Sequence, residues 1–258
     1  MAVDLSEQGD RQSELTHALG AVRSRLAAAA EAAGRNVSEI ELLAITKFFP
    51  ATDVAILSRL GCRSVGESRE QEASAKVAEL ARLLASSDQA DSRAMHWHMV
   101  GQIQRNKVRS LAGWAHTAHS VDSPRLVAAL DRAVAAALAD RRRENRLRAY
   151  VQVSLDGDLS RGGVDMTAPG AVDEVCARIE ESQSLELVGL MGIPPLDWDP
   201  NEAFDRLKSE HSRVLESFPD AVGLSAGMSN DLEIAVKHGS TCVRVGTALL
   251  GPRRLRSP

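Results

Sequence analysis

Residues 243–251 read VRVGTALLG, a buried strand pattern followed by a Gly-Thr corner and a short apolar turn. Such a strand-to-helix corner is the unit from which parallel α/β folds are built. An arginine, Arg244, lies in the middle of the strand. Because a buried permanent cation needs an acceptor or an anion beside it, the first question is what Arg244 binds.

Seven similar strand patterns precede this one, and helical patterns fill the gaps between them. Most of the eight are apolar enough to be buried on both faces, as parallel strands are. They cover residues 41–47, 64–67, 95–100, 116–122, 149–155, 185–191, 221–225 and 241–246. Eight strands separated by helices in a chain of this size predict a single (β/α)8 TIM barrel, with a doubly wound open sheet as the alternative.

A helical pattern also precedes the first strand. It covers residues 14–33 and stops at Gly34, so the barrel is expected to carry an extra N-terminal helix. Residues 1–12 are polar and are expected to form a flexible tail. Because no linker or low-complexity segment interrupts the chain, residues 1–258 are expected to form one domain.

Composition excludes several classes of protein. The net charge is −4, so no basic field attracts the chain to nucleic acid or to a membrane surface. The three cysteines are far apart, which favours a reducing compartment over a disulfide framework. The sequence shows neither a signal peptide nor an apolar run that would span a bilayer, and we expect a cytoplasmic protein.

Barrel chemistry is found at the carboxyl ends of the strands. Lys47 ends the first strand pattern beside apolar residues. Partial desolvation there is expected to lower the pKa of the amine and to let it attack a carbonyl group, forming a Schiff base. A solvated lysine at a strand end is the simpler interpretation of this residue taken alone.

Two corners near the C terminus have the composition of an anion site. Residues 223–233, GLSAGMSNDLE, end one strand with small and hydroxyl-bearing residues, and Glu233 follows Asn230 at capping-box spacing. Gly246 and Thr247 form a similar corner after the last strand. Free backbone N–H groups at neighbouring helix starts bind a phosphate dianion well, although the same residues are common in ordinary turns.

An amine that holds an aldehyde, facing a phosphate site across the same barrel opening, predicts pyridoxal 5′-phosphate (PLP) as cofactor. Arg244 precedes the second corner by two residues, so its guanidinium is expected beside the cofactor ring as a donor to the pyridine nitrogen. Arginine does not give up its proton. The ring nitrogen would therefore stay unprotonated, which makes the ring a weaker electron sink and disfavours transaminase chemistry.

Longer strings of the sequence resemble a known family. The strings are AITK, VGES, WHMVGQIQRNK, HSVDS, GLMGIPP, LSAGMSNDLEIAVKHGST and VRVGTALLG, between about residues 40 and 251. In this order they are similar to the pyridoxal phosphate homeostasis proteins (YggS/PROSC type), whose barrel resembles the N-terminal domain of alanine racemase. The resemblance implies a PLP-binding protein without well-established turnover, which buffers the reactive cofactor in the cell and passes it to apoenzymes.

The resemblance also implies residue roles. Lys47 matches the Schiff-base lysine, and Arg244 matches the partner of the ring nitrogen. The positions that match phosphate-binding residues are Ser229, Gly246 and Thr247. The positions that match residues near the cofactor or lining its pocket are Glu67, Ser68, His98, Met191 and Ser225.

Four positions depart from the family pattern. Phe49 stands where a second lysine is often found, which argues against a neighbouring lysine that relays the cofactor. The other three departures are Ser68 for asparagine, Arg69 for tyrosine and Ala226 for methionine. They leave open how polar the pocket is and how tightly the ring is held.

A small PLP-dependent amino-acid racemase is the main alternative function. Racemisation needs two acid/base groups on opposite faces of the cofactor. Lys47 would serve one face, but the single tyrosine, Tyr150, is expected at the wrong end of the barrel, and no second domain is predicted. We therefore expect a carrier with a partly exposed cofactor rather than an efficient enzyme, and a monomer, with a dimer left open.

A metal-dependent hydrolase is the second alternative. His96 and His98 form an HxH pair on one strand, as in some barrel hydrolases. His116 and His119 are expected to face opposite sides of the next strand, and His96 is expected deeper in the core than His98. Because these histidines are not expected to converge, no metal site is predicted.

Overall fold

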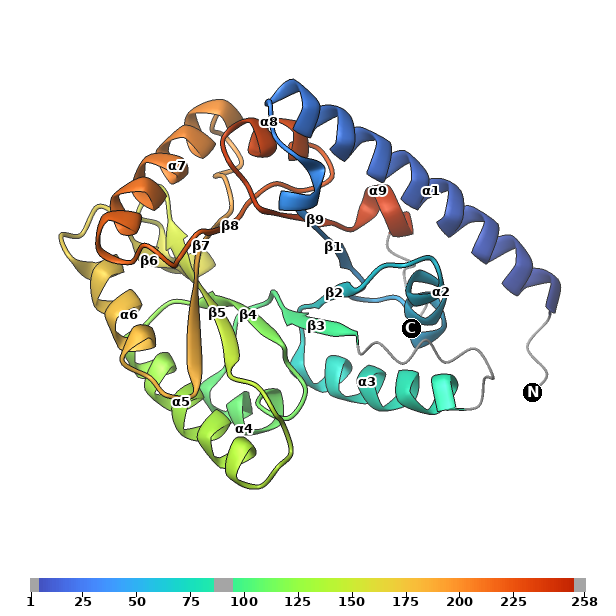
Figure 1. The fold of residues 1–258 in the computed structure, drawn as a ribbon, viewed down its shortest axis with the longest axis horizontal. Coiled ribbons are helices and arrows are strands. Elements are labelled where there is room, and N and C mark those ends of the chain that lie inside the picture. Colours follow the sequence, from blue (N-terminus) through green and yellow to red (C-terminus); the bar gives the residue numbers. More distant parts are fainter. Residues whose placement is uncertain (1–4, 86–94, 253–258) are drawn as a thin grey trace.

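The computed structural model describes residues 5–85 and 95–252. Within them, eight parallel strands form a closed ring in which β9 pairs with β1 and β4 pairs with β5 (Figure 1). The strands of the ring are β1 Glu41–Ile45, β2 Ser64–Glu67, β3 His96–Met99, β4 Thr117–Val121, β5 Leu147–Ser154, β7 Leu185–Gly192, β8 Gly223–Ser225 and β9 Cys242–Val245. Closure confirms the predicted barrel and excludes the open sheet.

The eight predicted strand patterns each correspond to one strand of the ring. The structure adds a ninth, β6 (Val164–Asp165), which pairs only with the carboxyl end of β5. Two residues are too few to produce a periodic pattern, and the sequence therefore does not predict this strand.

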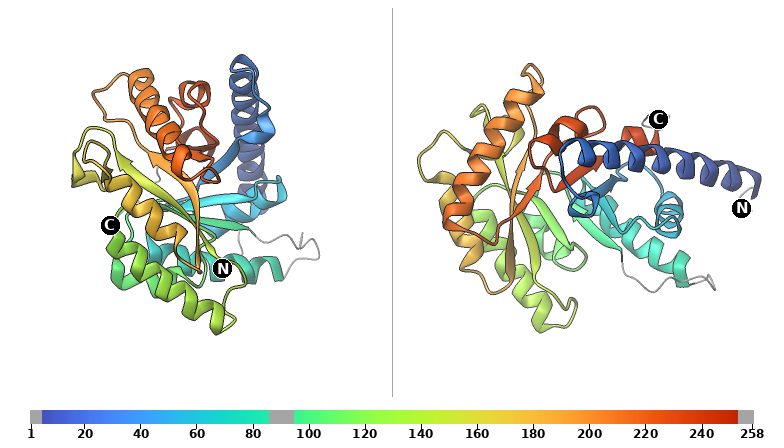
Figure 2. Two further views of the ribbon diagram at one scale, coloured as in Figure 1. Left: turned by 60° about the vertical axis from the view of Figure 1, so that its left-hand side comes forward. Right: turned by 45° about the horizontal axis from the view of Figure 1, so that its top comes forward.

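Helices surround the ring on its outside (Figure 2). They are α1 Leu5–Ala32, α2 Ala51–Arg59, α3 Glu70–Ala85, α4 Val108–Leu111, α5 Pro124–Ala139, α6 Ala171–Glu180, α7 Pro200–Ser217, α8 Leu232–Lys237 and α9 Thr247–Leu250, with the short 3-10 helices η1 Val37–Glu39, η2 Arg105–Lys107 and η3 Leu159–Arg161. None of the helices within the described residues has both the length and the apolar character needed to cross a bilayer.

Helix α1 completes the outer layer of the barrel. The helix after the last strand, α9, has only four residues, and α1 packs beside α8 and α9 at the same place (Figures 1 and 2). Its apolar side buries Leu15, Leu19 and Val22 in one cluster with Val243 and Leu249. The predicted extra helix is therefore part of the core.

The start of α1 differs from the prediction. The helix begins at Leu5 rather than at residue 14, so residues 5–12 are helical instead of a flexible tail. Arg11 explains part of the difference, because its guanidinium donates to the Asp53 carboxylate at 2.7 Å and to the Leu250 carbonyl at 3.1 Å. These tertiary contacts stabilise the N-terminal part of the helix, which the local sequence does not mark.

Two further arginines tie the N-terminal segment to the last two strand–helix units. Arg25 donates to the Ser229 carbonyl at 3.0 Å and to both oxygens of Glu233. Arg35, just after α1, donates to the Ser240 carbonyl at 2.7 Å. The loop that follows β8 and the loop that leads into β9 are thereby held from outside the barrel.

Strands β7 and β8 approach closely at Gly189. Its φ is +149°, and a Cβ atom there would lie 1.7 Å from the Gly223 carbonyl oxygen. We expect Gly189→Ala to lower the free energy of unfolding by about 3 kcal/mol or more, since the backbone of both strands must shift. Urea denaturation measures this change.

Gly20→Ala is the matched control for this variant. Gly20 lies in α1, where an added Cβ would meet nothing within 4 Å. Alanine is the better helix former, so this substitution is expected to raise the free energy of unfolding by about 0.5–1 kcal/mol. Similar stabilities for the two variants would contradict the close approach of β7 and β8.

Candidate functional site

A pocket of about 470 Å³ opens at the mouth of the barrel, the end where the strands terminate at their carboxyl ends. Its walls come from the loops after β1, β7, β8 and β9. Five of the ten residues singled out from the sequence line it: Lys47, Ser229, Arg244, Gly246 and Thr247. The amine, the buried cation and both predicted anion-binding corners therefore meet in one hollow, called the Lys47 pocket below.

Lys47 follows β1 in a tight turn and is half-buried. The next residue, Phe48, has a φ of +72°, a left-handed conformation that bulky residues rarely adopt. The turn is held through Thr46, whose carbonyl accepts from the Phe49 N–H at 3.1 Å and from the Lys76 amine at 2.9 Å. The backbone around Lys47 is thus fixed by partners on both sides.

Glu67 contributes to the same turn from behind. Its side chain is fully buried and points toward α3, where the Lys76 amine lies 2.6 Å from Oε1. The Thr46 hydroxyl donates to the same oxygen at 2.7 Å. Glu67, which the resemblance places near the cofactor, does not line the Lys47 pocket and instead holds the residue before Lys47.

Sequence reasoning missed Lys76. It lies on the buried face of α3 between Ala73 and Leu80 and is only 8% exposed. A lysine at a core position of an amphipathic helix, following a glutamate at a strand end, is the signal that was present in the sequence. A buried lysine requires an anionic partner, and Glu67 supplies it.

Arg244 enters the Lys47 pocket from inside the barrel and is 5% exposed. Its guanidinium donates to Ser225 Oγ at 2.7 Å and to the Gly192 carbonyl at 2.9 Å. Within the described residues it forms no ion pair with a carboxylate, and burial lowers its pKa from the ordinary value. An arginine has five N–H donors, so further donors remain for an acceptor in the pocket.

The two corners after β8 and β9 are joined directly. Ser229 Oγ accepts from the Ala248 N–H at 3.2 Å, which brings Ser229 beside Gly246 and Thr247. The predicted capping box between Asn230 and Glu233 is wrong. Helix α8 begins at Leu232 with Asp231 before it, and Glu233 pairs instead with Arg25 of α1, whose guanidinium is the stronger partner.

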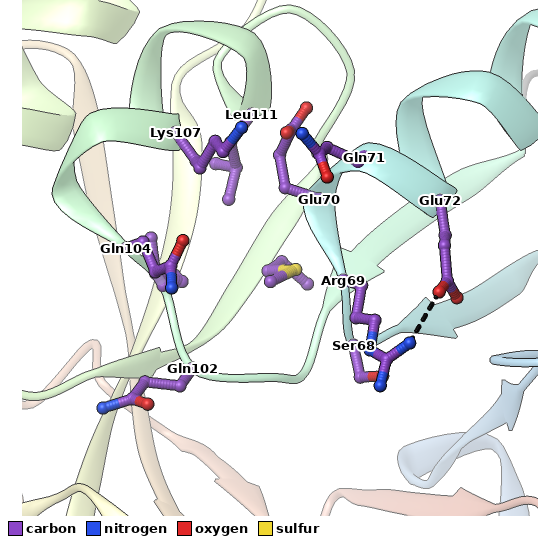
Figure 3. A pocket seen from close by; sticks show the side chains of 11 residues that line it. Ser68, Arg69, Glu70, Gln71, Glu72, Gln102, Gln104, Lys107 and Leu111 are labelled. Atoms are coloured by element: carbon purple, nitrogen blue, oxygen red, sulfur yellow. Dashed lines mark hydrogen bonds and ion pairs between the residues drawn. The ribbon is translucent and has the colours of Figure 1, made fainter.

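Ser68 lines a different pocket, of about 410 Å³, between the start of α3 and the loop that leads to α4. Figure 3 shows Ser68 and Arg69 on one side of this hollow and Gln104 and Lys107 on the other. Arg69 pairs with Glu72 at 2.9 Å, and its guanidinium also lies over the Phe48 ring at 5.5 Å. The departure at position 69 therefore contacts the turn of Lys47.

The remaining predicted residues lie in the barrel interior beneath the Lys47 pocket. His98 and Met191 are each 1% exposed and do not line it, whereas Ser225 contacts Arg244. Tyr150 is buried beside Met191, and its ring stacks on His119 at 4.6 Å between centroids. The single tyrosine is thus an interior residue, away from the pocket.

The prediction that the histidines of β3 and β4 do not converge was wrong. His98 Nδ1 lies 2.9 Å from His119 Nε2, and the rings of His96 and His116 stack at 4.0 Å. The parallel register pairs His98 with Thr117, which brings the two strands' histidines together. His96 is exposed rather than deep in the core, since it begins β3.

Convergence does not create a metal site among the described residues, where no group of three or more histidine, cysteine or acidic side chains has suitable geometry. Burial, followed by nearby positive groups, lowers the pKa of His116 to about 4. Burial also lowers the pKa of His98 to about 4, and only Glu41 acts in the opposite direction. These rings are neutral at physiological pH.

The fold and the site define a barrel of the alanine racemase N-terminal class, because residues 18–254 match the family model for the alanine racemase N-terminal domain. A Mycobacterium tuberculosis protein named pyridoxal phosphate homeostasis protein is 80% identical over 258 residues, all of both chains. The chain belongs to the pyridoxal phosphate homeostasis protein family.

Two solved structures extend the comparison. PipY of Synechococcus elongatus, with PLP bound, is 30% identical with a TM-score of 0.74, over 92% of this chain and 100% of that one. Alanine racemase of Clostridium difficile shares the fold alone, with 12% identity and a TM-score of 0.66. The likeness covers 92% of this chain but 55% of the racemase.

The buried pair of Glu67 and Lys76 gives a stability prediction. Lys76→Met leaves the Glu67 carboxylate buried without its cation, and we expect the free energy of unfolding to fall by about 3–5 kcal/mol. Adding Glu67→Gln removes the stranded charge and is expected to recover at least half of the loss. Urea denaturation of both variants measures the effect.

Arg82→Met supplies the control, because Arg82 is an exposed cation on the same helix. Its expected effect is within about 0.5 kcal/mol. If Lys76→Met is no more destabilising than Arg82→Met, the ion pair does not support the turn before Lys47.

Proposed function

We propose that this protein holds PLP in the Lys47 pocket and takes part in PLP homeostasis by storing the cofactor and delivering it to apoenzymes. The observation that carries the proposal is the meeting of Lys47 and Arg244 with the Ser229 and Gly246–Thr247 corners in one pocket. The name of the Mycobacterium tuberculosis relative and the PLP bound to PipY support the same cofactor.

The residues of the pocket fit the three functional groups of PLP. The Lys47 amine is suited to the aldehyde, Arg244 to the ring nitrogen, and the hydroxyl and backbone groups of Ser229 and Thr247 to the phosphate. PLP supplies an aldehyde that captures an amine covalently and reversibly. The pocket volume of about 470 Å³ lies within the usual range for a small ligand.

Reversible capture suits storage more than catalysis. Among the described residues that line the pocket, the ionisable groups are Lys47, Asp231 and Arg244. Asp231 Oδ1 accepts from the Met228 N–H at 2.5 Å, and Arg244 keeps its proton. The Tyr150 side chain is buried in the barrel interior, and this burial raises the pKa of its hydroxyl. We therefore propose that Tyr150 does not supply the second acid/base group that racemisation needs.

We also propose the domain organisation, oligomeric state, location and partners of the protein. Residues 1–258 work as one domain, a monomer in the cytoplasm, whose partners are PLP and PLP-dependent apoenzymes rather than nucleic acid or membrane. The open mouth supports delivery, because large apolar side chains at its rim are exposed. They are Phe48, Ile193, Leu196 and Met228.

Borohydride reduction tests the anchor. Purified protein loaded with PLP is expected to show a visible absorption band that borohydride removes, leaving a stable pyridoxyl adduct that mass spectrometry assigns to Lys47. Lys47→Ala should lose both the band and the adduct, whereas Lys237→Ala, on α8 away from the pocket, should retain them. A principal adduct at another lysine would refute Lys47 as the anchor.

A chiral assay separates the carrier from the racemase. Loaded protein incubated with L-alanine is expected to form no D-alanine above the level given by the Lys47→Ala variant. Sustained turnover that depends on Lys47 would overturn the proposal that the protein lacks efficient catalysis.

A further inference from the structure

A line of buried polar side chains runs through the barrel interior beneath the Lys47 pocket. It begins at Arg244, whose Nη1 donates to Ser225 Oγ at 2.7 Å. Ser225 Oγ lies 3.0 Å from His119 Nδ1, and His119 Nε2 lies 2.9 Å from His98 Nδ1. All four side chains are at most 5% exposed. The line ends near Glu41, whose Oε1 lies 3.7 Å from His98 Nε2.

We infer that this line positions the Arg244 guanidinium at the Lys47 pocket, which makes His119 and His98 positioning residues for the ring nitrogen of the cofactor. The inference rests on the proposed function, since a ring nitrogen meets Arg244 only if PLP occupies the pocket.

Two proton arrangements satisfy the line, because Ser225 Oγ has two lone pairs and the roles of the histidine nitrogens depend on their tautomers. In the first, every hydrogen bond runs from Arg244 toward Glu41. Arginine only donates, so Ser225 Oγ accepts from Arg244 and has one proton left to give. His119 accepts this proton at Nδ1 and therefore carries its own proton on Nε2. That proton is donated to His98 Nδ1, which leaves the His98 proton on Nε2, facing Glu41.

The carboxylate at the far end favours the same direction. Reversing the two hydrogen bonds of His119 would place a lone pair of His98 Nε2 opposite the Glu41 carboxylate, which is repulsive. In the favoured direction the His98 N–H points toward Glu41, although 3.7 Å is longer than a hydrogen bond and His98 Nε2 has no hydrogen-bond partner among the described residues. Ser64 holds Glu41 in place by donating to Oε1 at 2.5 Å.

Both histidines must be neutral for the line to hold, because an imidazolium has no acceptor nitrogen. Burial lowers the pKa of His98 to about 4 and that of His119 well below its usual value. The charged and titratable groups around them are Glu41, His96, His116, Arg148, Arg244 and Tyr150, whose ring stacks on His119. The line therefore persists through the physiological pH range.

Two further contacts fix the side chains of the line. The Tyr150 ring stacks on His119 at 4.6 Å between centroids, which fixes the plane of the imidazole. Arg244 is pinned at a second point, where Nη2 donates to the Gly192 carbonyl at 2.9 Å. These two hydrogen bonds, to Ser225 and to Gly192, hold the Arg244 guanidinium in one orientation. Its other N–H groups are then available to a ligand in the pocket.

PLP titration of His119→Phe tests the inference. Phenylalanine keeps a ring against Tyr150 but neither accepts from Ser225 nor donates to His98. We expect the dissociation constant for PLP, measured by visible absorbance, to rise about tenfold or more, since the arginine is no longer oriented. Borohydride should still attach the cofactor to Lys47 when PLP is saturating.

His211→Phe is the matched control. His211 is also buried and makes one hydrogen bond, to the Ala221 carbonyl at 2.8 Å, but it lies on α7 outside the strand ring. Its PLP affinity should stay within twofold of the wild type, even if its melting temperature falls. An equal loss of affinity in both histidine variants would mean that His119 acts only through stability.

Rescue gives a second readout. His119→Asn places an amide oxygen near the position of Nδ1, so it accepts from Ser225 and should recover most of the PLP affinity. In PLP-free protein, NMR should resolve the Nη protons of Arg244 for the wild type and for His119→Asn, but not for His119→Phe. Resolved Arg244 signals in the phenylalanine variant would overturn the inference.

The wild type alone tests the line if the phenylalanine variant fails to fold. The ¹⁵N shifts of PLP-free protein should report a neutral Nε2–H tautomer for both His98 and His119, and an Nδ1–H tautomer at either refutes the line. A missing borohydride adduct at wild-type Lys47 refutes the proposed function, whatever the tautomers are. An adduct at Lys47 together with unchanged PLP affinity in His119→Phe refutes the inference alone.

Discussion

Closure of the strand ring between β1 and β9 is the constraint on which the site depends. The pairing sets Leu43 beside Arg244 and Ala44 beside Val245, although some two hundred residues separate them in the chain. Lys47 leaves the end of one strand just where the Gly246 corner leaves the end of the other. The amine, the cation and the anion-binding corner are adjacent because the last strand completes the ring against the first, and no local feature of the sequence brings them together.

The site is held from two directions. On the outside, Arg25 of α1 fixes the loop of Ser229, and the pair of Glu67 and Lys76 fixes the residue before Lys47. On the inside, polar side chains reach Arg244 through Ser225. A rigid frame on both sides lowers the entropy lost when a ligand orders the pocket, while the open mouth leaves the ligand accessible.

The sequence predicts the barrel well because each strand is a short apolar run between well-marked helices. Such a run can be recognised from neighbouring residues alone, without knowledge of its partners in the fold. It also predicts the pocket residues that lie at strand ends, such as Lys47 and Thr247. It fails where the partner is distant in the chain. The early start of α1, the pairing of Glu233 with Arg25 and the contact of His98 with His119 all depend on neighbours that only the closed barrel supplies. Lys76 is hard to recognise because a single charged residue on an apolar helix face looks like a chance interruption of the apolar pattern. Only the folded structure shows that it forms a buried ion pair with Glu67.

The packing of α1 against α8 and α9 has a consequence for synthesis. Helix α1 buries its apolar side against α8 and α9, which are made much later than α1. Until residues 232–250 emerge, α1 has only part of its packing surface, the contact with α2, and β9 is missing from the ring that it closes against β1. Folding of the pocket therefore requires residues 232–250, and a chain that lacks them has no Gly246–Thr247 corner, however well its central strands have formed.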